Sequence, residues 1–164
     1  MKISELLDET GSDKNERHLY GSFYDIIFKK IQPKDILEIG VLQGASAMAF
    51  EKYGCRYVGV DMNPIEGFEI IEATEPDFGP VIDYCASNMC EFDVIIDDGS
   101  HDPVIQREAY KALFKYVRVG GYYVMEDLSV KQWITDVRLD YGASIVDFRP
   151  ITGHADSCLA YWRK

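Results

Sequence analysis

Residues 92–101, Phe-Asp-Val-Ile-Ile-Asp-Asp-Gly-Ser-His, set the expectation for the whole fold. Val94, Ile95 and Ile96 form a short β-branched apolar run, which is typical of a strand buried on both faces of a sheet. The run stops at two carboxylates, a glycine and a histidine. Ligands of open α/β sheets bind just beyond the carboxyl ends of the strands, so this stretch predicts a site at its polar end.

A second stretch repeats this arrangement, because residues 122–125, Tyr-Tyr-Val-Met, run directly into Glu126 and Asp127. If the two strands are neighbours, these acids converge with Asp97 and Asp98. Carboxylates so close repel one another unless some take up protons or a cation lies among them. The alternative is that Asp97 or Asp127 caps the following helix, or that the acids are solvated in loops.

The bulk properties predict one domain over residues 1–164, in which residues 1–32 form an N-terminal helical segment. Lys and Arg number 17 against 28 Asp and Glu, and the net charge of −11 argues against a nucleic-acid partner. No apolar run approaches the roughly 20 residues of a membrane span, and the N-terminus lacks the apolar core of a signal peptide. No membrane partner is therefore expected.

The four cysteines show no Cys-x-x-Cys pairing. Buried free thiols in a reducing cytoplasm are therefore expected rather than disulfides or zinc ligands, which predicts a cytoplasmic protein. The sequence does not decide the oligomeric state: Trp133 and Trp162 suit the interface of a homo-oligomer or simply the core.

A glycine-rich turn follows the first predicted strand, residues 36–40, and leads into a helix over residues 45–53. Its pattern is Glu38-x-Gly40-x-x-x-Gly44-x-Ser46. Such glycines let the backbone pass close to a ligand, and the following helix N-terminus offers free amides to an anion. The next strand, residues 57–61, ends at Asp61, about 20 residues after the glycine turn, where an acid suits a hydrogen bond to ribose hydroxyls. This unit predicts nucleotide binding.

The remaining elements complete a Rossmann-like, doubly wound α/β sheet. Asp102 and Pro103 suit the cap and first turn of a helix. The other patterns predict short helices over 3–9, 23–30 and 66–73, a third strand over 81–85, helices over 102–117 and 128–139, and strands over 144–148 and 158–162. We expect a mostly parallel sheet with an antiparallel C-terminal hairpin, and a minimal core without a large lid.

Several of these motifs resemble those of a known family. Glu38-x-Gly40-x-x-x-Gly44 and Asp61 are similar to the cofactor motifs of class I S-adenosylmethionine-dependent methyltransferases. The later motifs resemble more specifically the magnesium-dependent O-methyltransferases of antibiotic sugars, such as the macrolide deoxysugar enzymes: Asp97-Asp98-Gly99-Ser100-His101, Gln106, Gly120-Gly121-Tyr122-Tyr123-Val124-Met125-Glu126-Asp127-Leu128 and Trp133. The stretch Gly11-Ser12-Asp13-Lys14, with His18 and Tyr20, is similar to the N-terminal segment of that family. The resemblance covers residues 11–134.

The resemblance implies S-adenosylmethionine and Mg²⁺ as cofactors and a hydroxyl of a sugar or other small molecule as methyl acceptor. It implies Asp98 and His101 as catalytic residues, with His101 as general base. The implied metal ligands are Asp98, Glu126 and Asp127. The implied cofactor-binding residues are Glu38, Gly40, Gly44, Ser46, Asp61 and Asp97. The family usually has Gly-Asp after its third strand, where this chain has Ala86-Ser87-Asn88, so Ser87 or Asn88 is expected to substitute there.

Two other classes of function compete with this interpretation. One is an S-adenosylmethionine-binding protein without transfer activity, such as a sensor or a subunit, which the short chain favours and the complete set of acids and histidine opposes. The other is an NAD-dependent oxidoreductase, for which a Gly-x-Gly-x-x-Gly turn would be expected instead of the spacing from Gly40 to Gly44. The acceptor itself is not revealed by the sequence, because fold and motif do not define a substrate.

Overall fold

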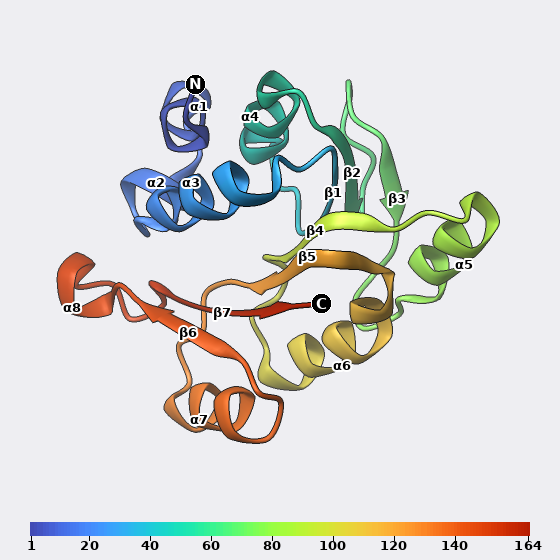
Figure 1. The fold of residues 1–164 in the computed structure, drawn as a ribbon. Coiled ribbons are helices and arrows are strands. Elements are labelled where there is room, and N and C mark those ends of the chain that lie inside the picture. Colours follow the sequence, from blue (N-terminus) through green and yellow to red (C-terminus); the bar gives the residue numbers. More distant parts are fainter.

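The computed structural model describes residues 1–164 and arranges them around a seven-stranded sheet in the order β3-β2-β1-β4-β5-β7-β6 (Figure 1). The strands are β1 (Asp35–Ile39), β2 (Arg56–Asp61), β3 (Ile70–Glu72), β4 (Phe92–Asp97), β5 (Val117–Met125), β6 (Ser144–Asp147) and β7 (Cys158–Arg163). Strands β1 to β5 pair in parallel, and β7 lies antiparallel between β5 and β6. The predicted fold class, including the antiparallel C-terminal hairpin, is confirmed.

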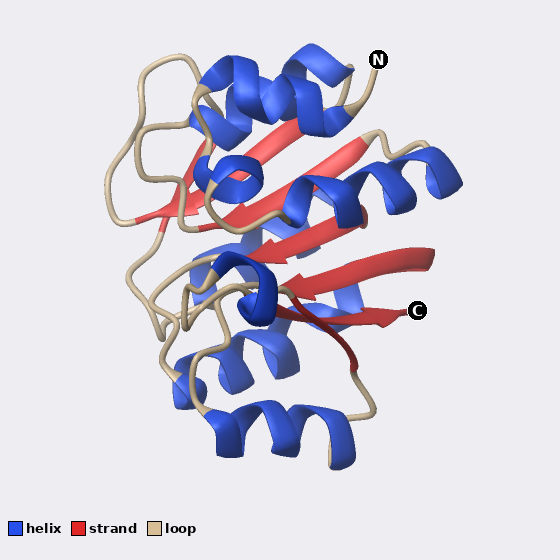
Figure 2. Cartoon of the chain, turned by 90° about the vertical axis from the view of Figure 1, so that its left-hand side faces the viewer, coloured by secondary structure: helices blue, strands red, loops and turns tan.

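Helices cover both faces of this sheet (Figures 1 and 2). One face packs against α1 (Ile3–Thr10), α3 (Tyr20–Ile31) and α4 (Ala45–Tyr53), and the other against α5 (Gly79–Asn88), α6 (Pro103–Leu113) and α7 (Lys131–Leu139). The shorter helices are α2 (Asp13–Glu16), η1 (Phe114–Tyr116) and α8 (Arg149–Thr152). None of the helices is both long and apolar enough to cross a membrane.

The central strand β4 explains why the sheet divides the core in two. Val94 and Ile96 pack into the cluster beneath α1, α3 and α4, whereas Ile95 packs into the cluster beneath α5, α6 and α7. All three side chains are fully buried. Successive residues of a strand point to opposite faces, so the β-branched run supplies both halves of the core at once.

The third strand was predicted in the wrong place. Residues 81–85 belong to helix α5, while β3 lies within the segment 66–73 that was expected to be helical. Helix α5 has a proline in its first turn, and Val81 and Cys85, four residues apart, are buried on one face. The four apolar residues around Asp83 fit a helix as well as a strand, so periodicity alone could not separate the two.

Smaller corrections concern where elements begin and end. The helix expected to reach residue 117 ends at Leu113, and a 3₁₀ turn leads directly into β5. The helix expected over residues 23–30 begins earlier, at Tyr20, and a short helix, α2, lies before it where none was expected. The cysteines are free as predicted, although Cys85 lies in a helix.

Candidate functional site

A cavity of about 820 Å³ opens where the parallel strands end. Figure 2 shows the loops that follow these strands gathered at one edge of the sheet. The predicted site residues on its wall are Gly40, Ser46, Asp61, Asp98, His101, Glu126 and Asp127. The structure therefore brings together acids that follow β4 and β5 with the glycine turn after β1, as expected for adjacent parallel strands.

The glycine turn packs directly against the loop that carries the acids. Gly40 has φ +81°, and a Cβ built there would lie 2.2 Å from the backbone oxygen of Asp98. Gly44 has φ +78°, and its Cβ would lie 2.6 Å from the ring of Phe68. Both positions favour glycine for their conformation, and Gly40 also needs it for space because its neighbour is backbone. The turn and the loop with the acids therefore lie in close contact at Gly40.

Asp61 ties the end of β2 to this turn. Its Oδ2 accepts hydrogen bonds from the backbone N–H groups of Val41 at 3.0 Å and Leu42 at 3.3 Å, and its Oδ1 accepts one from Asn63 N–H at 3.2 Å. A carboxylate has about four lone-pair sites, so acceptor capacity remains on the cavity side. Asp61 can therefore both shape the turn and accept hydrogen bonds from ligand hydroxyls.

Five predicted cofactor residues do not line the cavity, and one of them is Gly44, although its neighbours Gln43 and Ala45 do. Ser87 and Asn88 lie at the exposed C-terminal end of α5, where Asn88 Nδ2 donates to Tyr84 O at 2.8 Å. This placement overturns their assignment to the end of the third strand, and Thr74 and Glu75, which follow β3, line the cavity there instead. Glu38 and Asp97 lie beneath the cavity and are completely buried.

The buried Glu38 carboxylate is held by a dense set of donors. Its Oε2 accepts from Ser46 Oγ at 2.7 Å and from Tyr57 OH at 2.6 Å, and its Oε1 lies 3.3 Å from Lys14 Nζ. Burial raises the pKa of Glu38, an effect that the Lys14 ammonium opposes. Glu38 thus orients Ser46, which does line the cavity.

Asp97 is held differently, on the α6 side of the sheet. Its Oδ2 accepts from Tyr123 OH at 3.0 Å, and its Oδ1 is buried without a partner. Burial, reinforced by the nearby charge of Glu75, raises the pKa of Asp97 to about 8. A carboxyl group in this state is protonated at neutral pH, so it supports the loop beneath the cavity instead of contributing charge to it.

Lys14 neutralises much of the acidic cluster from outside the sheet. Its Nζ lies 2.5 Å from Asp98 Oδ2, 2.6 Å from Glu126 Oε2 and 3.3 Å from Glu38 Oε1. Burial alone would lower the pKa of Lys14, but the three carboxylates raise it well above its ordinary value. Sequence reasoning placed Lys14 in a motif without giving it a role, because its partners lie 84 and 112 residues away along the chain.

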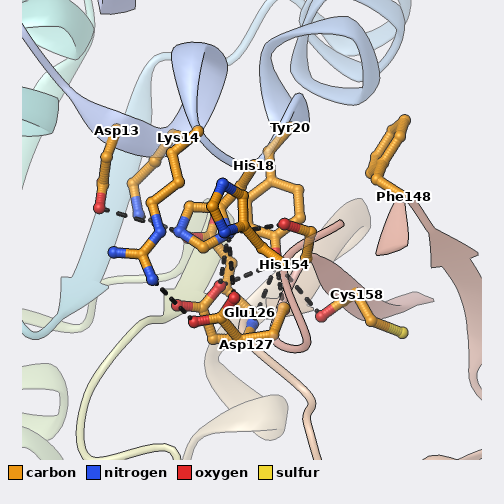
Figure 3. Close-up of polar contacts among 12 residues, drawn as sticks. Asp13, Lys14, His18, Tyr20, Glu126, Asp127, Phe148, His154 and Cys158 are labelled. Atoms are coloured by element: carbon orange, nitrogen blue, oxygen red, sulfur yellow. Dashed lines mark hydrogen bonds and ion pairs between the residues drawn. The ribbon is translucent and has the colours of Figure 1, made fainter. Parts of the chain in front are cut away.

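Asp127 lies close to two histidines, His18 and His101. Figure 3 shows its contacts with the N-terminal segment that carries His18 and Tyr20. Its Oδ1 is 3.6 Å from His18 Nδ1 and accepts a hydrogen bond from Tyr20 OH at 2.8 Å, while its Oδ2 is 3.8 Å from His101 Nε2. Burial and the charge of Asp98 raise the pKa of Asp127, and His18 opposes that shift. His18 and Tyr20 of the N-terminal segment therefore belong to the site.

Two of the central residues hold strained backbone. His101 and Asp127 both have φ +58°, in the left-handed region that side chains rarely adopt. Such conformations cost on the order of 1–3 kcal/mol each and persist only where the surrounding contacts determine them. The two side chains approach each other to 3.8 Å, and strained backbone of this kind is concentrated at functional sites.

A buried polar chain supports Glu126 from behind. Gln106 Nε2 donates to the backbone oxygen of Glu126 at 2.9 Å, and Trp133 Nε1 donates to Gln106 Oε1 at 2.9 Å. The Glu126 carboxylate accepts from Tyr24 OH on Oε1 and from Lys14 Nζ on Oε2. Gln106 and Trp133 thus act as supports, and the structure supplies the role that their motif left undefined.

The arrangement fits a divalent cation in part. Ligand atoms of Asp98, His101 and Asp127 lie within 4.8 Å of one another. Hard carboxylate oxygens are the donors that Mg²⁺ prefers, with water completing its octahedral shell. Asp98 and Asp127 therefore fit a magnesium ion, whereas Glu126 would have to exchange a contact with Lys14 or Tyr24 to become a ligand.

Comparison with proteins of known activity shows which proteins the chain resembles. It is 32% identical over 127 residues to 8-demethyl-8-(2-methoxy-alpha-L-rhamnosyl)-tetracenomycin-C 3'-O-methyltransferase of Streptomyces olivaceus, covering 68% of this chain and 32% of that protein. It is 30% identical over 134 residues to L-olivosyl-oleandolide 3-O-methyltransferase of Streptomyces antibioticus, covering 71% of this chain and 34% of that protein. No family model matches the chain.

The structural comparison identifies the fold. A crystal structure of MycE methyltransferase from the mycinamycin biosynthetic pathway, in complex with Mg and SAH, superposes with a TM-score of 0.77 at 23% identity, covering 100% of this chain and 55% of that chain. The chain has the class I methyltransferase fold. The predicted resemblance to sugar O-methyltransferases is confirmed. The chain spans about a third of the length of the curated relatives it matches.

Proposed function

We propose that this chain is an S-adenosylmethionine-dependent and Mg²⁺-dependent O-methyltransferase that acts on a hydroxyl of a sugar or other small molecule. The observation that carries the proposal is the convergence of Asp98, His101 and Asp127 on the same cavity wall as the glycine turn and Asp61. The curated relatives methylate sugar hydroxyls by their names, and the MycE complex holds Mg and SAH, which supports the same chemistry here.

The cavity offers separate places for the parts of the cofactor. The turn from Gly40 to Gly44 would hold the amino-acid end, and Asp61 would accept hydrogen bonds from the ribose hydroxyls. Thr74 and Glu75 follow β3 beside this position and would border the base. Asp98 and Asp127 would hold the magnesium ion.

When bound, S-adenosylmethionine supplies a methyl group on a sulfonium and Mg²⁺ lowers the pKa of an acceptor hydroxyl. His101 accepts the hydroxyl proton at Nε2, which faces Asp127 Oδ2 at 3.8 Å. The Asp127 carboxylate, which accepts a hydrogen bond from Tyr20, stabilises the imidazolium that forms.

Calorimetric titration with S-adenosylhomocysteine in excess Mg²⁺ tests the cofactor assignment. We expect saturable 1:1 binding in the wild type and its loss in Asp61→Ala, while Asp83→Ala, an exposed acid on α5 outside the cavity, binds normally. A screen of hydroxylated glycosides with labelled cofactor then tests transfer. Binding without transfer to any acceptor would favour the sensor or subunit alternative, and no binding by folded protein would remove the cofactor assignment.

A further inference from the structure

Lys14 is buried at the centre of the site although it lies on a helix of only four residues. Its side chain is 3% exposed. The three carboxylates it contacts come from different strands: Glu38 lies on β1, Asp98 follows β4 and Glu126 follows β5. An ammonium group is almost never buried without partners, so this position depends on the acids.

The acids depend on Lys14 in return. With Lys14 absent, Asp98 and Glu126 would face each other with no positive charge between them, and Asp127 would add a further acid beside them. Tyr24 OH donates to Glu126 but brings no charge. One ammonium faces the carboxyl groups of Glu38, Asp98 and Glu126, so these groups cannot all be ionised together unless a further positive charge joins them.

We propose that Lys14 is the built-in counter-cation of the metal-free cluster and competes with a divalent cation for the carboxylates of Asp98 and Glu126. Lys14 is thus a positioning residue that holds the acids together until the metal arrives. This inference rests on the proposed function, because it assumes that a divalent cation enters this cavity.

Competition between Lys14 and a divalent cation predicts the direction in which metal affinity changes when Lys14 is replaced. The Lys14 ammonium lies 2.5 Å from the Asp98 carboxylate, a proposed ligand, and 2.6 Å from that of Glu126, which could become a ligand only by releasing a present contact. A positive charge at this distance opposes the approach of a second cation to the same oxygens. Removing the ammonium should therefore increase the affinity for a divalent cation and lower the stability of the metal-free protein. A residue that merely packed against the site, or that helped to hold the metal, would not produce this pair of opposite effects.

Titration with Mn²⁺ alone, followed by its electron paramagnetic resonance signal, measures the first effect. We expect Lys14→Met to bind Mn²⁺ on the order of tenfold more tightly than the wild type, and Lys14→Arg, which keeps the charge, to bind no more tightly. Lys52→Met is the matched control, because Lys52 pairs with Glu9 at the surface at 2.8 Å and should leave Mn²⁺ affinity unchanged. Equal or weaker binding in folded Lys14→Met overturns the proposal.

Thermal unfolding in EDTA measures the second effect. Lys14→Met should lower the melting temperature, and adding Glu126→Gln should restore part of the loss, since the double variant removes both members of the pair. If Lys14→Met does not fold in EDTA, Lys14→Gln replaces it in both measurements, and folding of Lys14→Met only with Mn²⁺ supports the proposal. Additive losses in the two single variants overturn it.

The outcomes separate this inference from the proposed function. If wild type and Lys14→Met bind Mn²⁺ equally, the metal proposal stands and the competition is wrong. If no variant binds Mn²⁺, both the competition and the magnesium requirement are wrong, while S-adenosylhomocysteine binding still reports on the cofactor assignment.

Discussion

His101 Nε2 lies 3.8 Å from Asp127 Oδ2, and both residues hold left-handed backbone at φ +58°. The two side chains come from loops after neighbouring parallel strands, and the register that pairs Asp97 with Met125 brings those loops together. The sheet therefore brings the two residues together, and their left-handed backbone persists because the surrounding structure determines it.

Replacing His101 by alanine should abolish methyl transfer while cofactor affinity is retained. A general base typically contributes about 10²–10⁴-fold in rate, and its removal leaves the glycine turn and Asp61 unchanged. The measurements are turnover with labelled cofactor and calorimetry with S-adenosylhomocysteine. Turnover within a few fold of wild type would contradict the assignment of His101 as the base.

Removal of divalent metal should stop transfer without preventing cofactor binding. Asp98 and Asp127 supply the hard oxygen donors, whereas the glycine turn and Asp61 lie on another part of the cavity wall. We expect turnover to fall to background in EDTA and to return with added Mg²⁺, while S-adenosylhomocysteine still binds. Undiminished turnover in EDTA would contradict the metal ligand assignment.

The parts of the fold that were predicted correctly are those that a short stretch of sequence specifies by its own composition. The run from Val94 to Ile96 specifies a buried strand by its own composition, and the acids after it are adjacent in sequence. The composition of residues 81–85 does not specify one element, because the spacing of their apolar residues fits the period of a helix as well as that of a strand. Assigning the strand there moved Ser87 and Asn88 into the site and left Thr74 and Glu75 out.

The parts of the site that sequence reasoning missed are those that depend on distant contacts. Lys14 reaches Glu126 across 112 residues, and Tyr24 reaches it across 102. Glu38 carried the expected motif but points beneath the cavity, toward Tyr57 and Lys14. A motif fixes which strand end a residue follows, whereas the direction of its side chain is set by neighbours that the motif does not contain.

Replacing Tyr24 by phenylalanine should destabilise the protein by about 1–3 kcal/mol, because it leaves an oxygen of the buried Glu126 carboxylate without its donor. Tyr53→Phe is the matched control: Tyr53 packs its ring against Phe28, and its hydroxyl has no hydrogen-bond partner within the chain. Its effect should stay within about 0.5 kcal/mol. Urea denaturation measures both variants, and equal effects would show that Tyr24 contributes packing alone.

The carboxyl group of Asp97 should make stability depend on pH. Its pKa is raised from 3.8 to about 8 on folding, so the folded protein binds a proton that the unfolded chain releases. The stabilisation is fully present below pH 3.8 and is lost as pH rises through 8. Urea denaturation in EDTA at several pH values should therefore show a decline that Asp97→Asn reduces, and an unchanged profile in that variant would exclude Asp97 as its source.

Replacing Gly40 by alanine tests whether close packing of the glycine turn holds the cavity together. The new Cβ would meet the backbone oxygen of Asp98 at 2.2 Å, so the turn or the loop must move. Gly54→Ala is the control, because Gly54 also has positive φ, +102°, but a Cβ there meets nothing within 4 Å. Left-handed strain alone costs about 1–2 kcal/mol, and a clash adds about 1–3 kcal/mol.

We therefore expect Gly40→Ala to lose more stability than Gly54→Ala and to lose affinity for S-adenosylhomocysteine, which Gly54→Ala retains. Urea denaturation and calorimetry measure the two effects separately. If both variants lose the same stability and bind S-adenosylhomocysteine equally well, residue 40 needs glycine only for its left-handed conformation and not for its contact with Asp98. A larger loss at Gly40 alone shows that the contact with Asp98 couples the glycine turn to the acids, and hence the two halves of the cavity to each other.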